Sequence, residues 1–160
     1  TQEALGNAPV AVCIVDGKRP IYLNEANFKT ESGTPDYKKA EAVLIHESHH
    51  ASSQGFVNDK FFSDDQSLSW TLDEIATEHF TKKVWDTKHP DRRDEYYKYT
   101  SYFRGQKQDD TGKGWFGHQG PDLAQACGGE ANLARAYFTG DRKVLEGKES
   151  AIETVVRKVM

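Results

Sequence analysis

Three histidines and a glutamate within five residues, His46-Glu47-Ser48-His49-His50, are the part of the sequence best suited to chemistry. Read as His46-Glu47-x-x-His50, they form the HExxH pattern. Residues four apart lie on the same face of an α-helix, so His46 and His50 can offer imidazole nitrogens to one metal ion. Glu47 follows the first ligand and can take a proton from a water molecule and pass it to a leaving group. The pattern therefore predicts a metal-dependent hydrolytic site.

The residues around this pattern favour the helix that it needs. Pro35-Asp36 can start a helix, because Pro is tolerated in the first turn and Asp favours the positive end of the helix dipole. Gly55 offers a stop. Between them, apolar residues recur at roughly helical spacing: Ala40, Val43, Leu44 and Ile45. The alternatives are a chance match or a polar patch on a solvated helix, but imidazoles on a buried helix need partners.

A zinc ion held by two histidines still needs a third protein ligand, with one position left open for water. Segment 70–80 is the best place to look for it. Thr71 and Glu74 have the capping-box spacing with which a helix begins, although Glu74 cannot both close a capping box and bind zinc. On a helical wheel Glu74, Glu78 and Trp85 lie roughly opposite a broad, mainly apolar face, made of Leu72, Ile75, Ala76, His79 and Phe80. The alternative is an ordinary amphipathic helix with solvated glutamates.

Together, the two segments resemble the gluzincin metallopeptidases, the class that includes the thermolysin-like enzymes. The HExxH pattern is followed about twenty-four residues later by an acidic segment, Asp73-Glu74-Ile75-Ala76-Thr77-Glu78. In the family, an Asn-Glu-x-x-x-Asp/Glu segment supplies the third ligand, which implies Glu74 here. The acidic residue one turn later orients a zinc-bound histidine in that family, which implies Glu78. Asp73 replaces the usual Asn and the spacer is slightly longer, so Glu74 and Glu78 both stay open as the third ligand. The resemblance covers roughly residues 36–85, about a third of the chain.

Length and composition indicate a single domain. The chain has 160 residues, a mass of 18.0 kDa, a formal charge of −4 and a mean hydropathy of −0.78. This length predicts one domain, residues 1–160, that is large enough for a core. The negative charge disfavours a general nucleic-acid partner, and no apolar stretch is long enough to span a membrane. Because no signal peptide is visible and the first residue is Thr1, we expect a processed product or an excised domain.

The N-terminal segment predicts a small hairpin. An apolar, β-like run at 10–15 contains Cys13, and a turn at 16–20 can lead into a second strand at 21–23. We expect this hairpin to lie beside the HExxH helix. Cys13 and Cys127 form no CxxC motif, so they do not suggest a structural zinc site. They could form a disulfide or remain two buried thiols, and the apolar run around Cys13 favours a core thiol.

The rest of the chain predicts helices and one glycine-rich loop. The helix that contains Glu74 should end near Lys88, before a break at 89–91. Further helices are expected at 92–99, from Pro121 to 138 with an interruption at 128–129, and after 140–141. The loop 106–120 contains His118, a candidate for stabilising a tetrahedral oxyanion, because a donor aimed at developing negative charge is a large catalytic term. The alternative is an exposed loop histidine.

These observations predict an α+β, zincin-like metallopeptidase domain, mainly helical, with a small β-sheet next to the active-site helix. His46, His50 and Glu74 are predicted to bind Zn²⁺, and Glu47 and His118 to act in catalysis on a protein or peptide substrate. Size and motif layout also resemble the metallopeptidase domains of bacterial secreted toxins and effectors, which implies secretion and an immunity or inhibitor protein as a partner. Two rivals stay open. One is a peptide deformylase, whose Glu-Gly-Cys-type motif is absent here, and the other is a non-catalytic binding module with a structural zinc or none.

Overall fold

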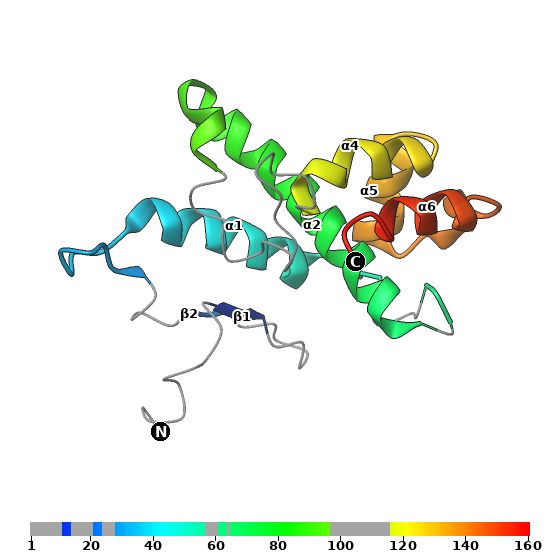
Figure 1. The fold of residues 1–160 in the computed structure, drawn as a ribbon, viewed down its shortest axis with the longest axis horizontal. Helices are drawn as coiled ribbons and strands as arrows, with labels where there is room; N and C mark the ends of the chain where they lie inside the picture. Colours follow the sequence, from blue (N-terminus) through cyan, green and yellow to red (C-terminus); the bar gives the residue numbers. More distant parts are fainter. Residues whose placement is uncertain (1–10, 14–20, 24–27, 57–60, 64, 97–115) are drawn as a thin grey trace.

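The computed structural model describes residues 11–13, 21–23, 28–56, 61–63, 65–96 and 116–160. Helices dominate this part of the chain, as predicted. The five α-helices described are α1 (Tyr37–Ser52), α2 (Gln66–Lys88), α4 (Phe116–Ala126), α5 (Glu130–Thr139) and α6 (Glu149–Val156). The long helix α2 is central. Helix α1 lies on one side of it and α4, α5 and α6 lie on the other (Figure 1).

Two short strands accompany α1. Strand β1 (Ala11–Cys13) pairs antiparallel with β2 (Ile21–Leu23), with Val12 opposite Tyr22, and both strands lie next to α1 (Figure 1). Each strand has only three residues, and no third strand joins them among the described residues. A single ladder of this length does not form a sheet layer. The mainly helical character is therefore confirmed, whereas an α+β, zincin-like architecture is not shown.

Helix α1 begins and ends where the sequence predicts. Asp36 is the N-cap, and its Oδ1 accepts a hydrogen bond from the Lys39 N–H at 3.0 Å. The helix ends at Ser52, and Gly55 follows with a φ of +64°. His46 and Glu47 are on the buried side of this helix. The predicted alternative of a solvated helix is therefore wrong.

Helix α2 begins earlier than predicted. Asp65 is its N-cap, and Oδ1 of that residue accepts hydrogen bonds from the N–H groups of Ser67 and Leu68. Thr71 instead donates its hydroxyl to the Ser67 carbonyl at 2.8 Å, so the predicted capping box is wrong. Asp65 was missed because the connection 52–69 offers several residues that can cap. As a consequence, Glu74 lies inside the helix and its carboxylate is available for another role.

All residues of α2 from Thr71 to Thr81 are buried, because other elements cover the helix on two sides. The predicted alternative, solvated glutamates on an amphipathic helix, is wrong at Glu74 and Glu78. The apolar side of α2 belongs to the main hydrophobic core with α4, α5 and α6. The largest fully buried aliphatic and aromatic members of that core are Phe56, Leu72, Ile75, Leu123, Leu133, Tyr137, Leu145 and Ile152. The polar side of α2 faces α1.

The part of the chain after Lys88 differs from prediction in the boundaries of its helices. Helix α4 starts at Phe116, so the predicted loop is wrong for 116–120, while 106–115 lie outside the described residues. The predicted break after Lys88 is confirmed, and the 3-10 helix η3 (Pro90–Glu95) follows it; 97–99 lie outside the described residues. The expected last helix is split into the 3-10 helix η5 (Arg142–Leu145) and α6. Gly147, with a φ of +76°, lies between the two. A positive φ is the conformation that glycine adopts most easily, which accounts for the break.

Two further sequence expectations concern the cysteines and the membrane. Cys127 is a free, buried thiol, whereas the side chain of Cys13 lies outside what the structure describes. None of the described helices combines the length and the apolar character needed to cross a bilayer.

Candidate metal centre

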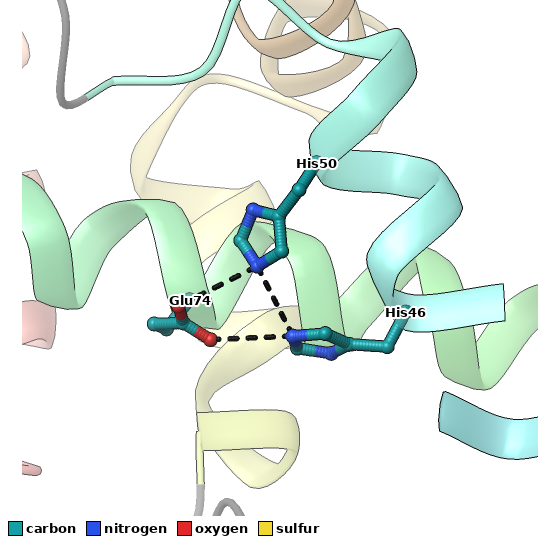
Figure 2. A group of neighbouring side chains, drawn as sticks. All are labelled: His46, His50 and Glu74. Atoms are coloured by element: carbon teal, nitrogen blue, oxygen red, sulfur yellow. Dashed lines mark hydrogen bonds and ion pairs between the residues drawn. The ribbon is translucent and has the colours of Figure 1, made fainter. Parts of the chain in front are cut away.

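The structure brings together the three predicted metal ligands from two helices. His46 and His50 extend from α1 and Glu74 extends from α2, and their polar ends converge (Figure 2). The Nε2 atoms of His46 and His50 lie 3.1 Å apart. Oε2 of Glu74 is 3.4 Å from Nε2 of His46, and Oε1 of Glu74 is 3.4 Å from Nε2 of His50. Three potential ligand atoms of the types that zinc prefers thus share one small volume.

This cluster is largely shielded from solvent. His46 is 1% exposed and Glu74 is 8% exposed, whereas His50 is half-buried. Among the described atoms, Oε2 of Glu74 is buried and accepts no hydrogen bond, although His46 lies close to it. A buried carboxylate oxygen is costly unless a cation or a donor compensates it. The residues present therefore fit a bound cation.

A carboxylate lies behind each imidazole. Nδ1 of His46 is 3.6 Å from Oε2 of Glu78, and Nδ1 of His50 is 3.1 Å from Oδ2 of Asp73. A carboxylate at Nδ1 fixes the ring orientation and leaves Nε2 to face the centre. Glu78 thus lies behind His46, as the family resemblance implies, while Glu74 faces both Nε2 atoms. The geometry favours Glu74 over Glu78 as the third ligand.

Sequence reasoning missed the roles of two residues in this arrangement, Asp73 and Tyr96. Asp73 was noted only as a departure from the usual Asn, yet it contacts His50 and its Oδ1 accepts a hydrogen bond from the Phe56 N–H at 2.5 Å. Tyr96 donates its hydroxyl to Oε2 of Glu78. The position of Asp73 next to Glu74 was a usable signal. No spacing rule indicated Tyr96, because η3 brings it back onto α2.

The electrostatics of the metal-free cluster follow from these contacts. Burial lowers the pKa of His46, but the nearby carboxylates of Glu74 and Glu78 outweigh this effect and raise the pKa to about 9. For His50, burial again lowers the pKa, and Asp73 and Glu74 raise it to about 10. Burial raises the pKa of Glu74, but the two histidines outweigh this and hold it at about 2. Without a metal, the protonated histidines pair with the carboxylates, and these ion pairs hold the cluster together.

The remaining predicted site residues lie elsewhere or lack a described contact with the cluster. Glu47 is buried on α1, one residue after His46. His118 is exposed on α4, in a helix instead of a loop, and does not belong to the cluster of potential ligands. His49, the third histidine of the run, contacts the Ile45 carbonyl and Thr81, and burial lowers its pKa.

A surface pocket is separate from this cluster. It has a volume of about 510 Å³ and lies against α1 and α2, with Leu44, His49 and Val84 among its lining residues. None of the three predicted ligands lines it.

A scan against protein-family models, a search of curated proteins and a search of solved structures each find no match. The site is therefore interpreted from its own geometry.

Proposed function

We propose that this chain is a zinc-dependent hydrolase of peptide bonds, with His46, His50 and Glu74 as the residues that would hold the ion. The separations of the potential ligand atoms carry the proposal. Two atoms bound to one zinc ion at about 2.0–2.1 Å and at the tetrahedral angle lie about 3.3 Å apart. The Nε2 atoms of His46 and His50 lie 3.1 Å apart, and each lies 3.4 Å from a different one of the two oxygens of Glu74. A set of ligands already spaced in this way needs little rearrangement to bind zinc.

Among the described residues, the number and type of potential ligands favour catalysis over a purely structural role. Catalytic zinc sites have three protein ligands and keep the fourth position for water or substrate, whereas structural sites are closed by four, usually with cysteine. Cys127, a free thiol in the main hydrophobic core, does not belong to the cluster. A bound zinc ion supplies a Lewis acid that polarises a carbonyl and makes water more acidic.

Glu47 is the proposed general base and general acid. It follows His46 on α1 and is buried, so its carboxylate can act in an environment of low polarity. In the proposed reaction it takes a proton from the attacking water and delivers that proton to the nitrogen of the leaving amine. His118 does not belong to the cluster of potential ligands, and the proposal does not use it.

A protein or peptide is the proposed substrate, and a secreted effector or toxin is the proposed biological context. The second proposal has only the size and motif layout of the chain in its favour. An immunity protein would then be the expected partner. Co-purification of a tight inhibitor encoded beside the parent gene would support that context, and a gene without such a neighbour would argue against it.

The proposed function is tested first by metal content. Elemental analysis of the purified wild type should give about one zinc per chain, and Glu74→Ala should retain much less. Glu47→Gln should keep its zinc and lose hydrolysis of a peptide substrate, because the base is removed and the ligands are not. Full hydrolysis in Glu47→Gln would rule out the mechanism. A wild type without zinc, after refolding with zinc supplied, would rule out the metal site.

A binding module with a structural zinc is the second candidate. The burial of His46 and Glu74 favours it, because a substrate must reach an open coordination position. Half-buried His50 marks the more accessible side of the cluster. A small zinc-binding inhibitor such as hydroxamate separates the two candidates. It should bind the zinc-loaded protein at an open position, and fail to bind if the position is closed.

A further inference from the structure

The turn after α1 contacts the carboxylate that orients His50. Phe56 donates its N–H to Oδ1 of Asp73, and the other oxygen of that carboxylate, Oδ2, lies 3.1 Å from Nδ1 of His50. Asp73 is buried on α2, next to Glu74 in the chain. One carboxylate therefore links the backbone of the turn to a proposed ligand.

Position 55 of this turn suits only glycine. Its φ is +64°, a left-handed conformation that side chains disfavour. A Cβ atom built at Gly55 would lie 2.7 Å from Oδ1 of Asp73, closer than real Cβ contacts allow. The turn thus packs directly on the Asp73 carboxylate. A side chain at position 55 would push this carboxylate away from its present place.

Elements from the C-terminal part fasten the turn. The N–H groups of Gln54 and Gly55 both donate to the Tyr137 carbonyl on α5, at 3.0 and 3.2 Å. Arg142 on η5 donates a hydrogen bond to the Gly55 carbonyl, and its guanidinium group lies 4.3 Å from the centre of the Phe56 ring. This arginine therefore contacts the turn through a carbonyl and through an aromatic face.

We infer that Arg142 is a positioning residue for His50, acting through the turn at Gly55–Phe56 and the carboxylate of Asp73. The inference rests on the proposed metal site and adds a part that neither the HExxH pattern nor the family resemblance contains. Arg142 lies 92 positions after His50 in the chain, and it is not a member of the cluster of potential ligands. Its contribution is to hold the turn against Asp73, which keeps the Nε2 atom of His50 facing His46 and Glu74.

The test uses two variants that perturb the turn, and each is compared with a control variant that leaves the turn unchanged. Gly55→Ala pushes on Asp73, whereas Gly147→Ala introduces a side chain at a similar positive φ with no atom within 4 Å. Arg142→Met removes the hydrogen bond to the Gly55 carbonyl and the contact of the guanidinium group with the Phe56 ring. Arg157→Met removes an exposed arginine that pairs with Glu153, one turn earlier on α6. Each control makes the same kind of chemical change at a residue outside the proposed path, which runs from Arg142 through the turn and Asp73 to His50.

Two measurements separate positioning from general stability. Zinc affinity is measured by competition with a chromophoric chelator at a temperature where all variants are folded. It should fall about 10–100-fold in Gly55→Ala and Arg142→Met, the range typical for the residues behind metal ligands, and stay within about twofold of wild type in both controls. Nitrogen-15 NMR of the histidine rings in the metal-free protein should show the hydrogen-bonded Nδ1–H of His50 perturbed in the same two variants.

The outcomes also separate this inference from the proposed function. Zinc affinity and the His50 resonance equal to wild type in Gly55→Ala and Arg142→Met would overturn the inference while leaving the metal site intact. An equal loss of affinity in all four variants would indicate a general effect of stability and would also overturn it. A wild type that binds no zinc would overturn the proposed function. The Nδ1–H resonance of His50 in the metal-free protein would still decide whether Arg142 positions that ring.

Discussion

The Nε2 atom of His46 faces the Nε2 atom of His50 at 3.1 Å, from one turn of α1 to the next. If both nitrogens carry protons, two donors point at each other. If only one does, it donates a hydrogen bond to the other, and if neither does, two lone pairs meet in a buried place. A bound cation can accept both lone pairs, and the Glu74 carboxylate supplies the compensating negative charge. This relationship leads to predictions about pH, metal and stability.

Zinc affinity should rise with pH over a wider range than for ordinary histidines. In the metal-free protein the neighbouring carboxylates raise the pKa of His46 to about 9 and that of His50 to about 10, so zinc must displace protons at neutral pH. From about pH 6.5 to 8.5, each unit should strengthen binding by about 10- to 100-fold, according to whether one or two protons leave. Binding measured in chelator-buffered zinc gives this slope.

A substitution at Asp73, whose carboxylate lies behind His50, tests the cause of this dependence of zinc affinity on pH. Asp73→Asn keeps the size of the side chain but removes the charge that raises the pKa of His50. Its pH dependence should be shallower than that of wild type and reach a plateau at lower pH. A wild-type affinity that stops rising near pH 7 would show that the pKa values of both histidines are ordinary and would contradict the prediction.

The stability of the metal-free protein should have the opposite dependence on pH. The pKa values of His46 and His50 lie above their ordinary value of 6.5. Their ion pairs therefore stabilise the fold fully below that pH, and the stabilisation is lost as pH rises through about 9 and 10. Glu74 contributes fully above its ordinary pKa of 4.5 and loses its contribution as pH falls through about 2. Urea unfolding of the chelated protein should show lower stability at pH 9.5 than at pH 6.

Glu74→Gln is the matched control for this effect, because it removes the carboxylate shared by both histidines. Its loss of stability between pH 6 and pH 9.5 should be smaller than in wild type. Other groups also titrate in this range, so the difference between the two proteins is the quantity that matters. An identical loss in both proteins would mean that the cluster does not cause it.

Chelation should lower the thermal stability of the wild type. A ligand that binds only the folded state at about 100 times its Kd stabilises it by about 2.7 kcal/mol. For a domain of this size, each kcal/mol corresponds to about 2–4 °C in Tm, so removing zinc should lower Tm by about 5–10 °C. Differential scanning fluorimetry with and without a chelator measures the change. Glu74→Ala should show no such change, and an equal response in that variant would place the stabilising metal elsewhere.

The sequence predicted the His46, His50 and Glu74 cluster better than it predicted the residues that hold this cluster in place. The i, i+4 spacing of His46 and His50 requires only a helix, and Asp36 and Gly55 marked that helix well. Glu74 was identified through a family segment, although the wrong start was assigned to α2. A capping box at Thr71 and a cap at Asp65 are both compatible with local rules, and only tertiary packing decides between them.

Long-range contacts explain the rest. Asp73 and Tyr96 orient the histidines through contacts that no periodicity encodes, since η3 and the turn at Phe56 bring distant parts of the chain together. The role assigned to His118 depended on a loop, yet α4 begins at Phe116. Glycines at 112, 114, 117 and 120 favoured a loop at that position, but the structure describes a helix from Phe116 onward, and Gly120 packs closely on His79.

Replacing Tyr96 should weaken both the fold and the metal site. Tyr96 is fully buried and donates its hydroxyl to Glu78, which lies behind His46. Tyr96→Phe leaves a buried carboxylate oxygen without this donor, which should cost about 1–3 kcal/mol of stability. Zinc affinity should fall by up to about tenfold, because His46 loses part of its support. Tyr37→Phe, at a side chain that is 78% exposed, should change neither quantity, as measured by urea unfolding and zinc competition.

The Cys127 thiol should be nearly inert in the folded protein. It is fully buried, and burial raises its pKa to about 12 despite the opposing charge of Lys148. At pH 8 only about one thiol in ten thousand is then ionised, and the thiolate is the form that reacts with alkylating reagents. In the unfolded chain, with a pKa near about 8.5, a sizeable fraction is ionised.

A Cys13→Ser background isolates this thiol for measurement. In native buffer at pH 8, iodoacetamide labelling of Cys127 followed by mass spectrometry should be slower by about a thousandfold than in urea, because the reagent must wait for an opening of the core. Cys127 lies where α4 meets the segment before α5, so the labelling rate reports how often that part of the core opens. Rapid labelling in native buffer would contradict the burial of Cys127 and, with it, the packing of α4 against the core.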